Sequence, residues 1–96
     1  MTTPKPLAIA DFQEHIRQRY YETDAARGTP GTFLWFIEEV GELATALHGN
    51  DPANLEEEFA DVLAWLCTLA NINGVDLGLA VQAKYLKGPG PEGVKP

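Results

Sequence analysis

Cysteine and histidine are scarce in this chain. Cys67 is the single cysteine among 96 residues, and there are two histidines. A lone cysteine cannot form an intramolecular disulfide, and the lack of a Cys/His cluster argues against zinc and iron–sulfur centres. The first dozen residues carry one lysine and a short apolar patch without a small-residue cleavage site, so they do not resemble a secretory signal. We therefore expect a cytoplasmic protein.

Long apolar runs and basic residues are also in short supply. No run approaches the ~18–20 apolar residues that cross a bilayer, so no membrane partner is expected. Seven Lys and Arg stand against fourteen Asp and Glu, which gives a formal net charge of −7. Affinity for nucleic acid comes mainly from Lys and Arg, so nucleic-acid binding is not expected either.

The pattern that is present is helical. Turn and cap residues divide the chain, and no run of alternating β-branched residues indicates a strand. We predict an all-α fold of four helices in one domain over residues 1–87, with a flexible Gly/Pro-rich tail over residues 88–96. The first helix is expected to run from about Ala8 or Asp11 to near residue 23, followed by a loop over residues 24–31. The later helices are expected to end near residues 48, 73 and 87.

Capping residues set these predicted boundaries. Asp11 and Glu14 have the spacing of a capping box, and Thr29 followed by Pro30 is typical of an N-cap and first helical turn. Gly49 stands where a left-handed C-cap is expected. Similar start and stop signals occur at Asp51, Gly74 and Asp76.

The second and third predicted helices repeat one arrangement of acids. Glu39-x-x-Glu42 recurs nineteen positions later as Glu58-x-x-Asp61, and no Lys or Arg lies between the two pairs. The short connection between the helices predicts an antiparallel hairpin. We expect the apolar stripes of both helices, centred on Val40 and Phe59, to face inward, with the acids on the flank and back. The mirror symmetry of the hairpin then places the four carboxylates level on one side.

Four carboxylates without a neighbouring base repel one another, and such a group takes up protons or binds a cation. All-oxygen ligands favour Mg²⁺ or Mn²⁺, and Mg²⁺ shares its coordination positions with substrate phosphates. The alternative is that the acids are simply the solvated faces of two amphipathic helices. Glu38, beside the group, is a candidate general base.

The segments FLWFIEEVGELATAL and LEEEFADVLAWLCTLAN resemble the MazG-like family of all-α nucleoside triphosphate pyrophosphohydrolases. The resemblance extends over roughly residues 32–85. It implies a helical bundle that forms a homodimer or a tetramer of paired dimers and cleaves a (deoxy)nucleoside triphosphate to the monophosphate and pyrophosphate. It also implies Mg²⁺ held by Glu39, Glu42, Glu58 and Asp61, with Glu38 or Glu39 as the candidate catalytic base.

Substrate-binding candidates lie near these acids. Trp35 and Trp65 are each one turn from an acid and should flank one pocket, where an indole can stack on a nucleobase. Burial in a subunit interface is the alternative. Lys84 is the candidate phosphate ligand, although a solvated lysine near a helix end is an equally good interpretation.

Two other functions remain open from the sequence. One is a catalytically idle helical module whose acidic face binds a basic partner. The other is a pyrophosphohydrolase that acts on another nucleotide-type phosphoanhydride. In each case we expect at least a homodimer, because four short helices leave apolar surface that a lone hairpin cannot cover.

Overall fold

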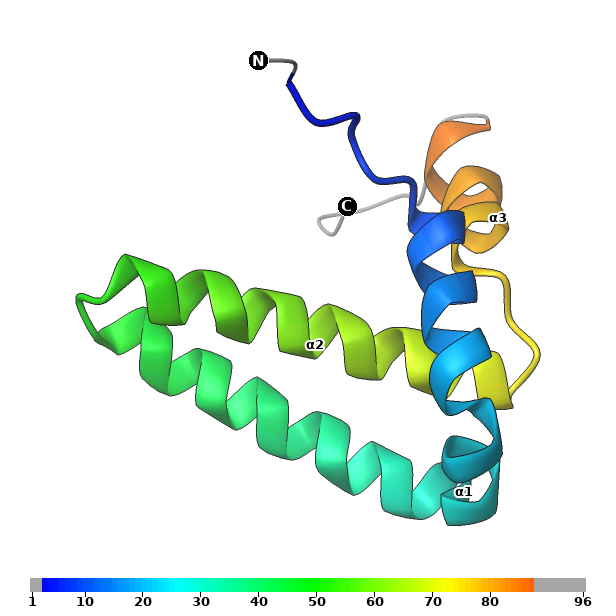
Figure 1. Cartoon of the computed structure of the whole chain (residues 1–96), viewed down its shortest axis with the longest axis horizontal. Helices are drawn as coiled ribbons and strands as arrows, with labels where there is room; N and C mark the ends of the chain where they lie inside the picture. Colours follow the sequence, from blue (N-terminus) through cyan, green and yellow to red (C-terminus); the bar gives the residue numbers. More distant parts are fainter. Residues whose placement is uncertain (1–2, 88–96) are drawn as a thin grey trace.

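The computed structural model describes residues 3–87, which are helical throughout their regular part (Figure 1). Helix α1 spans Ile9–His48, α2 spans Pro52–Ile72 and α3 spans Leu77–Val81, followed by a π-helical turn over Gln82–Leu86. The all-α prediction is confirmed for these residues, while the predicted tail over residues 88–96 lies outside them. Within the described range no single helix is long and apolar enough to cross a bilayer; α2 and the segment Leu77–Leu86 meet that criterion only together, across a 98° bend.

Helix α1 departs most from the sequence prediction. The predicted loop over residues 24–31 is wrong, because the first two predicted helices join at a single non-helical residue, Gly28, with φ 81° and ψ 169°. Glycine adopts a positive φ at little cost, and Pro30 is tolerated where the helix restarts because a first-turn N–H needs no helical partner. We call residues 9–27 the N-terminal arm and residues 30–48 the C-terminal arm.

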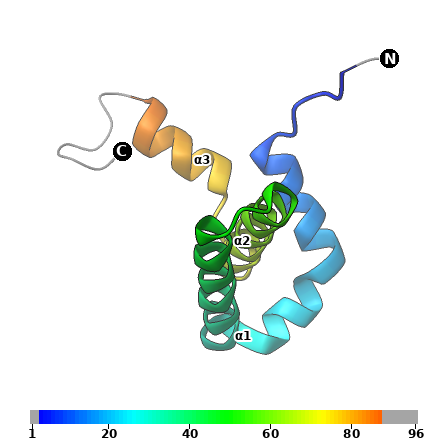
Figure 2. The same ribbon diagram turned by 90° about the vertical axis from the view of Figure 1, so that its left-hand side faces the viewer.

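The C-terminal arm and α2 form the predicted antiparallel hairpin, and the N-terminal arm runs across its open end (Figure 1). In Figure 2, which views the hairpin almost end-on, the N-terminal arm and α3 extend to opposite sides of it. Hydrogen bonds of Gln13 link the N-terminal arm to the end of α2 and the start of α3. Its buried side-chain amide donates to Asn71 Oδ1 at 3.0 Å and to the Val75 carbonyl at 2.7 Å, and it accepts from the Leu77 N–H at 2.9 Å.

Two of the predicted N-caps are confirmed. The Asp51 side chain accepts hydrogen bonds from the N–H groups of Ala53 and Asn54, at 3.1 and 3.3 Å. The Asp76 side chain accepts from the Leu79 N–H at 2.9 Å. Each bond satisfies a backbone donor that the first turn of a helix leaves without a helical partner.

Two other cap predictions are wrong. The expected capping box does not form, because the first helix begins at the earlier of its two expected starts, with Ala8 as its N-cap and Asp11 within the first turn. Glu14 pairs with Arg17 instead of capping the backbone. Gly49 ends α1 with φ −85°, outside the left-handed region, because its N–H reaches the Ala46 carbonyl at 3.1 Å without a left-handed turn.

Each helix of the hairpin is rotated about its own axis relative to the prediction, so a different stripe of residues faces the partner helix. Its inward positions on α1 are Thr32, Phe36, Glu39, Leu43 and Ala46, all buried or half-buried. At 100° per residue this stripe is centred roughly 80° from Val40, the centre of the predicted inward stripe. The corresponding inward positions on α2 are Leu55, Glu58, Val62, Trp65 and Leu69.

This rotation has two consequences. Part of the expected apolar stripe is exposed instead; Phe33 is 48% exposed and Phe59 is 53% exposed, while Phe36 and Val62 keep the expected inward position. Glu39 and Glu58 move from the expected flank into the half-buried space between the two helices. The predicted inward stripe is therefore wrong in part, and its exposed residues form an uncovered apolar surface on the single chain.

Candidate metal centre

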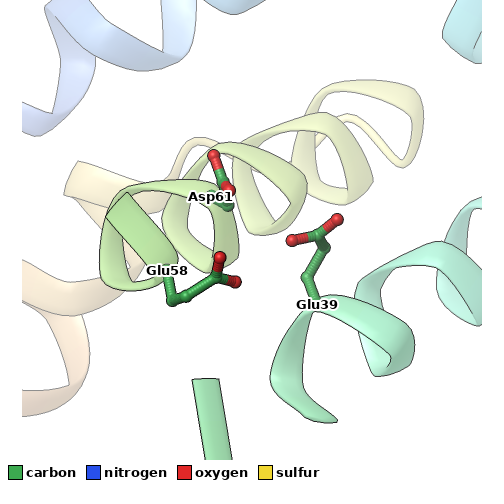
Figure 3. Close-up of side chains that lie close together, drawn as sticks. All are labelled: Glu39, Glu58 and Asp61. Atoms are coloured by element: carbon green, nitrogen blue, oxygen red, sulfur yellow. The ribbon is translucent and has the colours of Figure 1, made fainter. Parts of the chain in front are cut away.

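Three carboxylates meet between the two helices of the hairpin. Glu39 of α1 and Glu58 and Asp61 of α2 each offer one oxygen, and these oxygens lie within 4.8 Å of one another. Figure 3 shows the three side chains pointing toward a shared space from the two facing helices. The structure thus brings together three of the four acids that the sequence analysis grouped. We call these three residues the acidic cluster.

The acidic cluster has unfilled acceptor positions. The Oε2 atoms of Glu39 and Glu58 are buried without a hydrogen-bond partner among the described residues. A buried acceptor without a donor is costly, so such atoms call for a ligand. The ion pairs found within residues 3–87, Glu14–Arg17 and Asp24–Arg27, both lie in the N-terminal arm and leave the cluster uncompensated. Its oxygen ligands, negative charge and orphaned oxygens fit a hard divalent cation.

The electrostatics of the cluster follow from burial and repulsion. Burial raises the pKa of the Glu39 carboxyl above its ordinary value, and repulsion from Glu42 and Asp61 raises it further. The pKa of Glu58 is raised by the same causes in the same order. Glu42 repels both carboxylates, yet it stands outside the group whose oxygens all lie within 4.8 Å. It is therefore a neighbour at the edge of the cluster.

Glu38 is not part of this cluster. Its side chain is exposed, and it lies about 100° around α1 from Glu39. The structure therefore separates the two candidates for a general base, with Glu39 inside the hairpin and Glu38 outside it.

The two tryptophans lie against each other. The rings of Trp35 and Trp65 are nearly parallel, at 14°, with their centroids 6.0 Å apart. The Arg27 guanidinium lies 5.1 Å from the centre of the Trp65 ring, within the range of a cation–π contact. Trp65, but not Trp35, is among the residues that line a cavity beside the N-terminal arm.

Lys84 is remote from the acidic cluster within one chain. It lies on the π-helical turn after α3, at the end of α2 opposite the hairpin turn (Figure 1). Its ammonium group lies 5.6 Å from the centre of the Tyr85 ring. A contact between Lys84 and a phosphate held at the cluster therefore needs either a rearrangement or a second copy of the chain.

Sequence reasoning missed Asp24 and its pairing with Arg27, because both residues fall in the segment predicted as a loop. Arg27 donates to Asp24 Oδ1 at 3.1 Å, within one helical turn. The signal was present, since acid and base three residues apart are typical of a continuing helix. The nearby Gly28 and Pro30 outweighed it in the prediction.

Comparisons with known proteins agree with this geometry. Residues 29–88 match the MazG nucleotide pyrophosphohydrolase domain. The chain is also 34% identical over 79 residues to a dATP/dGTP diphosphohydrolase from cyanophage S-2L, a match that covers 82% of this chain and 71% of the relative. The domain match contains the entire hairpin with its acidic cluster. The chain therefore belongs to the MazG nucleotide pyrophosphohydrolase family and is a nucleotide pyrophosphatase.

Proposed function

We propose that this protein is a Mg²⁺-dependent enzyme, with Mn²⁺ as the alternative metal, that cleaves a (deoxy)nucleoside triphosphate to the monophosphate and pyrophosphate. The observation that carries the proposal is the acidic cluster: three convergent carboxylates, two of which keep a buried oxygen without a donor among the described residues. The name of the cyanophage relative, which specifies dATP and dGTP, favours a purine deoxynucleotide as substrate.

The proposed metal ligands are the acidic cluster together with Glu42 at its edge. When bound, Mg²⁺ supplies neutralisation of the triphosphate charge and a water molecule of lowered pKa. The protein's own task is to orient the attacking water and accept its proton. We assign proton acceptance to Glu39, because its carboxylate faces the shared space while the Glu38 carboxylate is exposed on the outside. Glu38→Gln should then retain most turnover, and Glu39→Gln should not.

We propose different roles for the two tryptophans in substrate binding. Trp65 lies in the wall of a cavity and is the proposed contact for the base, while Trp35 stacks against Trp65. Lys84 remains the proposed phosphate contact. Because it is remote from the cluster within one chain, we propose that a second copy supplies it.

We also propose that the protein is at least a homodimer. The support is the uncovered apolar surface of the hairpin, where Phe33, Phe59 and Leu63 are each more than 40% exposed. Contiguous exposed apolar surface of this kind is typical of protein–protein contacts. A cytoplasmic location remains a prediction from the sequence.

Pyrophosphate release from a panel of NTPs and dNTPs, with and without Mg²⁺, tests the function. We expect release to require the metal and to fall at least about ten-fold to a hundred-fold in Glu58→Gln. Glu56→Gln is the matched control, because Glu56 is an exposed glutamate two residues earlier on the same helix. Equal release with and without Mg²⁺, or equal loss in both variants, contradicts the proposal.

A further inference from the structure

A cavity of about 350 Å³ lies between the N-terminal arm and α2. This volume is at the lower end of the range for small-molecule sites. Its position suits a nucleotide, because Trp65 in its wall follows Asp61 of the acidic cluster by one helical turn, about 6 Å along α2. The lining includes Ile16, Tyr20, Asp24, Arg27, Trp65 and Thr68.

Asp24 is the unusual member of this wall. It is only 4% exposed. Its Oδ1 accepts the hydrogen bond from Arg27, but its Oδ2 is buried without a partner among the described residues. An ionised carboxylate can only accept hydrogen bonds, so this oxygen lacks a donor.

Arg27 fixes the charge and shape of the same wall. Its Nη1 donates both to Asp24 and to the hydroxyl of Thr32, at 3.3 Å, and Thr32 is fully buried. The guanidinium also lies over the Trp65 ring. Because the positive charge of Arg27 balances that of Asp24, the pair adds no net charge to the cavity. The site therefore suits a neutral heteroaromatic ring more than a phosphate.

The hydrogen-bonding pattern of the Asp24 carboxylate distinguishes among the nucleobases. A carboxylate with acceptor positions on both oxygens matches two adjacent N–H donors. Guanine presents that edge, with its ring N1–H beside its exocyclic 2-amino group. Adenine and cytosine present an amino group beside a ring nitrogen that is itself an acceptor, and thymine and uracil place a single N–H between two carbonyl oxygens. Only guanine therefore satisfies both oxygens without placing a lone pair against the carboxylate.

We propose that Asp24 is a specificity-determining residue that makes this cavity a guanine site, with Trp65 in its wall. The inference rests on the proposed function, because it takes the base to belong to the nucleotide whose phosphates reach the acidic cluster. It goes beyond that function in naming the base and the residue that selects it. Asp24 reads the Watson–Crick edge of guanine and does not take part in the cleavage.

The test compares two monophosphates in the presence of Mg²⁺, with tryptophan fluorescence as the readout. The ligands dGMP and dIMP differ only in the 2-amino group. We expect dGMP to bind roughly ten-fold more tightly than dIMP, as for loss of one good base contact. In Asp24→Asn the ratio should fall toward one, because the amide places an N–H against the donors of guanine. Glu22→Gln, an exposed acid on the same arm, is the matched control and should keep the ratio.

Each outcome bears on the proposal. Equal affinity of the unmodified chain for dGMP and dIMP, tighter binding of dAMP than dGMP, or an unchanged ratio in folded Asp24→Asn overturns it. The comparison on the unmodified chain needs no variant, so a failure of Asp24→Asn to fold does not remove the test. Binding needs no turnover, so a dGMP preference without triphosphate cleavage keeps this inference and rejects the proposed function. Cleavage without any base preference rejects this inference and keeps the proposed function.

Discussion

Glu39 and Glu58 face each other across the hairpin, and each keeps one buried carboxylate oxygen without a hydrogen-bond partner among the described residues. Both carboxyls have a raised pKa, first because of burial and then because of repulsion from neighbouring acids. The pair is thus a local source of instability in the metal-free protein. The chain retains two charged side chains at positions where apolar ones would pack the hairpin more tightly.

Divalent metal should stabilise the fold. A ligand that binds only the folded state adds about 2.7 kcal/mol at a concentration of 100 times its Kd. We expect Mg²⁺ or Mn²⁺ to raise the melting temperature in calorimetry, and to raise it much less for Glu58→Gln. Glu56→Gln should behave as the unmodified chain. A shift of equal size in all three proteins would show that the acidic cluster does not bind the metal.

The metal-free protein should lose stability as pH rises. The pKa values of Glu39 and Glu58 lie above the ordinary 4.5 in the folded chain, so between pH 4.5 and those raised values the folded state binds more protons than the unfolded state. This contribution is fully present below pH 4.5 and is lost as pH rises through the raised values. Urea unfolding in EDTA at several pH values should show it.

Two variants show which carboxyl groups cause this pH dependence of stability. The slope should flatten in Glu39→Gln, which removes one of the two raised groups, and should persist in Glu56→Gln. Glu14 acts in the opposite sense, because its bond with Arg17 lowers its pKa, so its contribution is lost only as pH falls below 4.5. A Glu39→Gln slope identical to that of the unmodified chain would contradict the assignment.

The joint in α1 should tolerate no side chain. Gly28→Ala forces an L-residue into φ 81°, ψ 169°, a region occupied almost only by glycine, at a cost of roughly 1–3 kcal/mol. Gly41→Ala is the control, because an added Cβ there meets nothing within 4 Å and the residue is helical. We expect it to stabilise by about 0.4–1 kcal/mol. Denaturant midpoints measure both; equal changes would mean that Gly28 is not held in this conformation.

Self-association should depend on the uncovered apolar surface. Phe59→Ser removes a large exposed apolar side chain from α2 without touching the acidic cluster, so it should weaken a dimer. Sedimentation at micromolar concentration compares it with Leu7→Ser, which removes a still more exposed apolar residue before α1 begins. A fully active monomer for the unmodified chain would contradict the proposed assembly.

The meeting of the carboxylates was predictable because hairpin geometry is simple. The two acid pairs stand at equal sequence distances from the turn, so antiparallel packing brings them level whichever face turns inward. The caps at Asp51 and Asp76 were equally predictable, because each depends only on the next few backbone N–H groups.

The rotation of the hairpin was not predictable from the wheel. The apolar arc on α1 is wide enough that more than one stripe can face a single partner helix, and the sequence favours the more apolar one. The structure adopts the other and buries part of Glu39 and Glu58. The kink was missed for a similar reason, since Gly28 and Pro30 give the same local signal in a loop and in a bent helix.

The kink at Gly28 separates, along α1, the residue proposed to select the base from the carboxylate proposed to bind the metal. Asp24 and the part of the cavity wall on the N-terminal arm precede Gly28 in the chain, whereas Glu39 follows it. If Asp24 selects the base as proposed, substitutions in residues 9–27 change which base is accepted while the hairpin carboxylates keep their spacing. In a chain of 96 residues, a single glycine thus allows the proposed base selection and the proposed bond cleavage to change independently during evolution.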